Sequence, residues 1–222
     1  MTLIALAGFL VGCATSQGLT EKDRSKIANI SLDPNVARPK DMFFLDQGNA
    51  LAFSLAAGGG AAGAAVGGVK GVAVGAGVGA AGGSFQSPQS AGQLLLQNAE
   101  RQGVLIEKIT LEELASAIRS AGRIPIAEAA STGTAVLVLS IQQFGFSVPH
   151  SFSSDVVPLL SIKCELKDET GRVIWSASDR LLPLGNPVKP ISIKDMYPNP
   201  KAMEDAWREA ARAVARYVAQ RL

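Results

Sequence analysis

Glycine recurs at every fourth position from Gly59 to Gly83, and this spacing limits what the chain can fold into more than any other feature of the sequence. The series lies within residues 55–83, which are almost entirely Gly, Ala and Val with Lys70 as the single charge. Residues four apart share one face of an α-helix, so a helix here would carry a groove without side chains that a second helix can approach closely. Such faces drive helix association in lipid. The glycines in this register are Gly59, Gly63, Gly67, Gly71, Gly75, Gly79 and Gly83.

This glycine segment, residues 55–83, needs lipid or a partner to be helical, because each glycine costs a helix in water about 1 kcal/mol relative to alanine. A single pass through a bilayer would place Lys70 near mid-membrane, at a cost of about 3 kcal/mol. A helical hairpin that turns near residues 67–71 would place Lys70 at a wet tip, and we favour this form. We therefore predict a segment that packs in the membrane or against copies of itself. The alternative is a flexible glycine-rich linker without fixed structure.

A second signal lies near the N-terminus. Residues 3–11 form an apolar run that has the length of a signal-peptide core and is shorter than the roughly 20 residues of a spanning helix. The sequence Leu10, Val11, Gly12 and Cys13 resembles the lipobox of bacterial lipoproteins, in which cleavage precedes the cysteine and that cysteine carries the lipids. The resemblance implies that Cys13 is acylated and begins the mature protein. Ala14 resembles the outer-membrane sorting pattern. The alternative is an ordinary apolar segment that contains a cysteine.

Residues suited to catalysis or metal binding are scarce. The chain has a single histidine and two cysteines, and a net charge of +2 from 21 basic and 19 acidic side chains gives no electrostatic footprint for nucleic acid. Cys164 is expected to pack as a small apolar residue in a strand. His150 lies between serines and Asp155, but no G-x-S-x-G nucleophile motif accompanies it. We expect no metal, no cofactor and no catalytic residue; the alternative is a hydrolase that uses His150.

A second glycine pattern, G-x-G-x-x-G at residues 77–82, also occurs in dinucleotide-binding proteins. That motif requires a preceding strand and a following helix, whereas residues 84–88 read Ser-Phe-Gln-Ser-Pro. We therefore expect no nucleotide site here.

Hydrophobic periodicity predicts an α+β fold with a mainly antiparallel sheet of about four strands, packed by two main helices. Strands are expected at residues 28–33 and 134–146, the latter central, and at residues 160–167 and 173–177 as a hairpin, with an edge or loop at residues 39–46. Residues 91–107 are expected to be partly helical, with an interruption at Gly103. A stronger helix is expected to begin at Thr110, capped with Glu113, and to end at Gly122.

The last helix is expected to bury a stripe of apolar residues against the sheet and to expose its charged face to solvent. Phe144, Phe146 and Phe152 are expected in the core, with a partner-binding rim as the alternative. The predicted stripe consists of Met203, Trp207, Ala210, Val214, Tyr217 and Val218, and the charged face of Glu204, Asp205, Arg208, Glu209, Arg212 and Arg216.

Residues 137–146, residues 166–175 and the helix around Trp207, together with the lipobox and the glycine segment, resemble an uncharacterised group of bacterial outer-membrane lipoproteins. The resemblance implies a signal peptide at residues 1–12, a lipidated N-terminus with the first strand at 13–54, the glycine segment at 55–83, and the main part of the domain at 84–222. The resemblance brings no activity with it. We predict a non-enzymatic, lipid-anchored protein of the outer membrane that faces the periplasm or the cell surface and has a structural or assembly role. Expected partners are the membrane, further copies of the chain or another envelope protein. The alternative function is an adaptor whose glycine segment is a tether.

Overall fold

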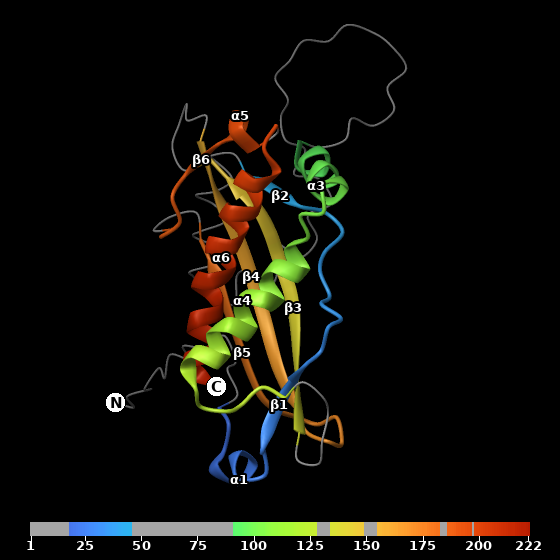
Figure 1. The fold of residues 1–222 in the computed structure, drawn as a ribbon, viewed down its shortest axis with the longest axis vertical. Coiled ribbons are helices and arrows are strands. Elements are labelled where there is room, and N and C mark those ends of the chain that lie inside the picture. Colours follow the sequence, from blue (N-terminus) through green and yellow to red (C-terminus); the bar gives the residue numbers. More distant parts are fainter. Residues whose placement is uncertain (1–17, 46–90, 128–133, 149–154, 183–185, 197) are drawn as a thin grey trace, which may run out of the picture.

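The computed structural model describes residues 18–45, 91–127, 134–148, 155–182, 186–196 and 198–222 (Figure 1). Cys13, the rest of the lipobox, the glycine segment, His150 and Phe152 lie outside these residues. The predictions made for them therefore stay predictions.

A six-stranded sheet forms the centre of the fold. Its main path runs in the order β1-β3-β4-β5, while β2 pairs with β3 and β6 pairs with β4. The strands are β1 (Asn29–Leu32), β2 (Phe43–Leu45), β3 (Thr134–Ser147), β4 (Asp155–Lys167), β5 (Val173–Leu181) and β6 (Ile191–Ser192).

The sheet is mixed, which corrects the prediction of a mainly antiparallel sheet of about four strands. β3, β4 and β5 run antiparallel as predicted, and β6 is also antiparallel to β4. However, β1 and β2 both run parallel to β3. Parallel neighbours need a long crossover, and the chain between β2 and β3 supplies one that includes two helices. The α+β class is confirmed.

Two long helices, α4 (Ile106–Ala121) and α6 (Pro200–Arg221), lie against each other on one face of the sheet, as predicted (Figure 1). Trp207 of α6 is fully buried between the strands and helices. Its ring centroid lies 6.1 Å from that of Phe144 and 5.9 Å from that of Phe146. Both phenylalanines therefore belong to the core and form no partner-binding rim. The shorter helices are α1 (Glu21–Arg24), α3 (Ala91–Arg101) and α5 (Ile193–Met196).

The predicted start of α4 was wrong by one turn. The helix begins at Ile106 after Leu105, and the hydroxyl of Thr110 donates to the Ile106 carbonyl oxygen at 2.7 Å inside the helix. The predicted interruption at Gly103 and the stop at Gly122 are confirmed, because both glycines adopt left-handed φ angles of 76° and 63°.

The predicted faces of α6 need two corrections. The apolar stripe is buried except for Tyr217, whose residue is 38% exposed. The charged face is not wholly solvated, because it forms ion pairs with α4. Arg212 Nε and Arg208 Nη1 each lie 3.1 Å from the Glu113 carboxylate, and the Glu113 side chain is only 10% exposed. Glu113 thus joins the two main helices and does not cap either of them.

Candidate interaction surfaces

The most specific feature of the domain is the place where residues 46–90 leave it and return. β2 ends at Leu45 and α3 begins at Ala91, and the two elements lie side by side. The side-chain amide of Gln93 donates to the Asp41 carboxylate at 3.1 Å. We call this place the insertion junction and define it as residues 41–45 and 91–94.

Gly92 allows α3 to approach β2 this closely. A Cβ atom at this position would lie 2.6 Å from the carbonyl oxygen of Met42, which is far inside normal contact distance. The neighbouring Leu95, Leu96 and Met42 are buried. Any other residue at position 92 would push the helix away from the strand. Gly92 therefore allows the two ends of residues 46–90 to lie at one place on the domain.

β2 is held on β3 by a similar close approach. Phe43 pairs with Gly145, whose φ of +155° is a conformation that other residues rarely adopt. A Cβ atom on Gly145 would lie 1.9 Å from the carbonyl oxygen of Phe43. Only glycine at position 145 is therefore compatible with this strand pairing.

Arg38 ties the connection between β1 and β2 to the helices. Its Nη2 and Nε atoms each lie 2.5 Å from a carboxylate, of Glu100 in α3 and of Glu107 in α4 respectively. Its guanidinium carbon also lies 5.5 Å from the centroid of the Phe144 ring. Only 19% of the Arg38 side chain is exposed, so these interactions are partly shielded from water. Arg38 therefore ties the β1–β2 connection to α3, α4 and the core.

A cleft of about 330 Å³ lies at the opposite end of the sheet, between α1, the start of β3 and the turn that joins β4 to β5. Arg172 bridges this cleft, with its Nη2 atom 3.2 Å from Asp23 and its Nε atom 3.0 Å from Asp168. The Thr170 hydroxyl donates to Asp168 and, together with Arg172, holds the pKa of that carboxyl at about 2. The cations and carboxylates of the cleft largely neutralise one another, so it presents no single charge to a ligand.

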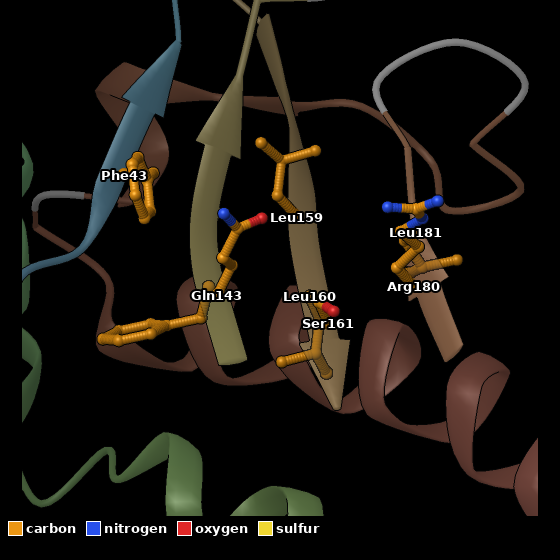
Figure 2. A pocket seen from close by; sticks show the side chains of 8 residues that line it. Phe43, Gln143, Leu159, Leu160, Ser161, Arg180 and Leu181 are labelled. Carbon is orange, nitrogen blue, oxygen red and sulfur yellow. The ribbon is translucent and has the colours of Figure 1, made fainter. Parts of the chain in front are cut away.

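The face of the sheet opposite α6 carries a shallow depression (Figure 2). Leu159 and Ser161 alternate with the core residues Leu160 and Ile162 along β4, and so point to this opposite face. The depression has room for about one water molecule. It is therefore a contour of the surface and not a pocket for a small molecule. The other residues that line it are Phe43, Gln143, Phe144, Leu160, Arg180 and Leu181.

The prediction that Cys164 packs as an apolar residue in a strand is confirmed. It lies in β4, fully buried, and burial raises the pKa of its thiol to about 12. Among the described residues, no group of three or more His, Cys, Asp or Glu side chains could hold a metal ion. Within the same residues, no helix is long and apolar enough to cross a membrane.

The insertion junction was not predicted from the sequence. Its clearest signal is Gly92, a glycine in the first turn of an otherwise good helix, which marks a close backbone approach but does not reveal the partner. The ion pairs of Arg38 and Arg172 were also missed, because their partners lie far away in the sequence.

Comparison with known proteins assigns no family. No family model matches the sequence, and no curated protein matches it either. Among solved structures, protein XCC0632 from Xanthomonas campestris, of the family model DUF330, is 16% identical with a TM-score of 0.36. That match covers 50% of this chain and 57% of the other, so it spans less than two thirds of the Xanthomonas protein.

Two structures of a PelC dodecamer from Paraburkholderia phytofirmans are also similar. One is 14% identical with a TM-score of 0.35 and covers 94% of this chain and 95% of that one. The other, a point variant, is 10% identical with a TM-score of 0.35 and covers 88% of this chain and 86% of that one. Similarities this low carry no argument about the fold or function of this chain.

Proposed function

We propose that this protein is a non-enzymatic, lipid-anchored component of the bacterial outer membrane with a structural or assembly role. Acyl chains on Cys13 provide the anchor, since each buried CH₂ group contributes about 0.8 kcal/mol to membrane binding. The glycine segment provides a second attachment, which packs in the membrane or against other copies of the chain. The α+β domain faces the periplasm or the cell surface.

The insertion junction is the observation that best supports this proposal. The contact between Gly92 and Met42 holds the two flanks of residues 46–90 at one place. A helix that crossed the bilayer once would leave its ends on opposite sides of a hydrocarbon layer about 30 Å thick. A hairpin enters and leaves on one side, which is compatible with two adjacent flanks. It also keeps Lys70 out of the centre of a single span.

Cysteine accessibility on the two flanks tests this topology. Ser54→Cys and Ser84→Cys lie just outside the glycine segment, and each is made separately in the lipidated protein in sealed vesicles. A membrane-impermeant maleimide added from one side should label both positions or neither, because a hairpin keeps both flanks together. Cys164 is buried and should not react with the maleimide, so it adds no background label. Labelling of the two positions from opposite sides would contradict the hairpin.

The alternative function is an adaptor module for an envelope machine, with the glycine segment as a flexible tether. The half-buried Val136 and Val138, on the face of the sheet opposite α6, favour this alternative, because that face offers apolar surface to a partner. The depression around Phe43 and Leu159 lies on the same face.

Leucine substitutions in the glycine segment distinguish the two functions. Replacement of Gly67, Gly71 and Gly75 by Leu fills the proposed packing face and should abolish detergent-resistant, cross-linkable oligomers. Replacement of three glycines outside the register provides the matched control, which should oligomerise more than the first variant. Unchanged oligomers in the first variant, with loss of an envelope partner from the complex, would favour the adaptor. The control positions are Gly60, Gly68 and Gly77.

A further inference from the structure

The two edges of the sheet end differently. At one edge, β1 has four residues and is covered on its far side, because the Ile30 N–H donates to the Pro125 carbonyl oxygen at 2.9 Å and the Ala127 N–H donates to the Ile30 carbonyl oxygen at 2.8 Å. At the other edge lies β5, which among the described residues pairs only with β4. β5 has nine residues without a proline, and its register with β4 is unbroken from Trp175 to Leu181. A long and regular edge of this kind is a template for pairing with another chain.

One acidic residue lies on the inner face of the β5 edge. Asp179 pairs with Ile162 of β4, and residues that pair directly in an antiparallel sheet point to the same face. Ile162 is fully buried in the core, so the Asp179 side chain also points to the core face, which α6 covers. Asp179 is half-buried, whereas Trp175 and Ala177 on the same face of β5 are buried. A charge that points inward on an edge strand opposes pairing of that edge with another strand.

The Asp179 carboxylate is compatible with its position because the edge leaves it partly in water. The backbone N–H of Arg180 donates to it, and the charges of Arg221 in α6 and Arg180 attract it. Burial nevertheless outweighs these favourable interactions and raises the pKa of the carboxyl above its ordinary value. A second strand laid along β5 would remove the remaining water from the carboxylate. It would therefore bury the charge further and make pairing unfavourable, unless that strand supplied a cation.

A second copy of the chain supplies no such cation through its own β5. When two β5 strands pair antiparallel around a two-fold axis, the core faces of the two sheets stay on the same side. Core-face residues of one strand then pair with core-face residues of the other. Between residues 175 and 181 the core-face positions are Trp175, Ala177, Asp179 and Leu181, and none of them is a cation. In every register that pairs these positions, Asp179 would therefore lie beside an apolar side chain or a second aspartate.

We propose that Asp179 prevents the β5 edge from pairing with the β5 edge of a second copy, so that copies of the chain associate through other parts and not through their sheets. The carboxylate is half-buried in the single domain, and it would be fully buried without a cation in the paired one. The difference between these two states is what excludes the second copy. The inference concerns described residues of the domain alone, and it does not depend on the proposed membrane role.

Cross-linking through position 178 tests this inference on the full-length protein in detergent micelles. Ser178 is exposed on β5, and antiparallel pairing centred near it brings two Ser178→Cys thiols within reach of a short bis-maleimide. Cys164 is buried and should not react. The chain without a new cysteine measures any cross-linking through Cys13. The measurement is the yield of covalent dimer, normalised to the labelling of the same thiol by a monofunctional maleimide.

Two substitutions remove the charge in this background. Asp179→Asn removes it with almost no change of shape, and Asp179→Val also adds apolar surface. Ser176→Val is the matched control, because it adds apolar surface to the other face of β5 and leaves Asp179 in place. Lys40→Cys replaces Ser178→Cys in a parallel set, since it is exposed in the β1–β2 connection at the opposite edge of the sheet. Near-ultraviolet circular dichroism from the buried tryptophans checks that each variant is folded.

Asp179→Asn should raise the dimer yield at position 178 at least about threefold, and Asp179→Val should raise it further. Ser176→Val should leave this yield within about twofold of the parent, and no variant should change the yield at position 40. An unchanged yield in the Asp179→Asn variant would overturn the inference, even if Asp179→Val raised it, because added apolar surface would then be the cause. An equal rise at positions 178 and 40 would also overturn it, since the copies would not be pairing through β5.

Discussion

Gly92 of α3 lies so close to Met42 that a Cβ atom on the glycine would be 2.6 Å from the methionine carbonyl oxygen. This contact joins two segments that are separated in the chain by the whole glycine segment. It sets where that segment leaves the domain and where it returns.

Gly92→Ala should destabilise the insertion junction. Overpacking of a tight contact costs about 1–3 kcal/mol, which exceeds the gain of about 1 kcal/mol from replacing glycine by alanine in a helix. The midpoint of thermal unfolding should fall by several degrees, and α3 should become more sensitive to protease. Gly18→Ala is the matched control, because its Cβ meets nothing within 4 Å, and it should leave the midpoint nearly unchanged. A Gly92→Ala variant as stable as the wild type would refute the close approach.

Gly145→Ala should detach β2 from β3. The added Cβ would lie 1.9 Å from the Phe43 carbonyl oxygen, and the φ of +155° would add backbone strain. Amide hydrogen exchange at residues 43–45 should become fast while β1 stays protected. Gly171→Ala also places alanine at a positive φ, of +80°, but in open space, so it should cost only about 1–2 kcal/mol and leave β2 protected. Protected amides at residues 43–45 in the first variant would contradict this pairing.

Glu113→Gln should weaken the contact between α4 and α6. Its carboxylate accepts from Arg208 and Arg212 at 3.1 Å and its side chain is only 10% exposed, so the loss should cost about 1–3 kcal/mol in denaturant unfolding. Glu112→Gln, whose side chain is 45% exposed, removes a single exposed ion pair with Arg208 and should cost less than about 1 kcal/mol. If the two variants lost equal unfolding free energy, burial of Glu113 would not strengthen its ion pairs.

Cys164 should make the domain less stable at alkaline pH. Burial raises the pKa of its thiol from 9.0 to about 12, so the unfolded chain loses this proton first. The contribution of this thiol to the free energy of unfolding is therefore fully present below pH 9.0. It falls by about 1.4 kcal/mol per pH unit as the pH rises toward 12. The difference in unfolding free energy between the wild type and Cys164→Ala, measured from pH 8 to pH 10, should therefore shrink. A difference independent of pH would mean that the thiol is solvated in the folded protein.

The sequence predicted the parts of the fold that local patterns determine. The alternation along residues 160–167 and the turn before Val173 identified the β4–β5 hairpin, and Gly122 marked the end of α4 because a left-handed stop favours glycine. The three residues of β2 are too few for a periodicity, so its parallel pairing with β3 was not predictable. Thr110 was misread as a cap because a Ser or Thr three residues before Glu also fits the interior of a helix, where its hydroxyl bonds the preceding turn.

The candidate surfaces were harder to predict than the fold. Arg38 joins Glu100 and Glu107 only because the β1–β2 connection, α3 and α4 meet in space, and no local signal connects these residues. The lipobox and the glycine register, by contrast, are local patterns, and they carry the proposals about the membrane.

Protease protection of residues 46–90 in native outer-membrane vesicles tests the central proposal most directly. The lipidated protein is digested with and without detergent, and peptides across residues 46–90 are identified by mass spectrometry. The account predicts that this stretch is protected in intact vesicles and cleaved once detergent is added. Cleavage throughout residues 46–90 in intact vesicles, with the α+β domain left whole, would contradict insertion and would identify the glycine segment as an exposed tether.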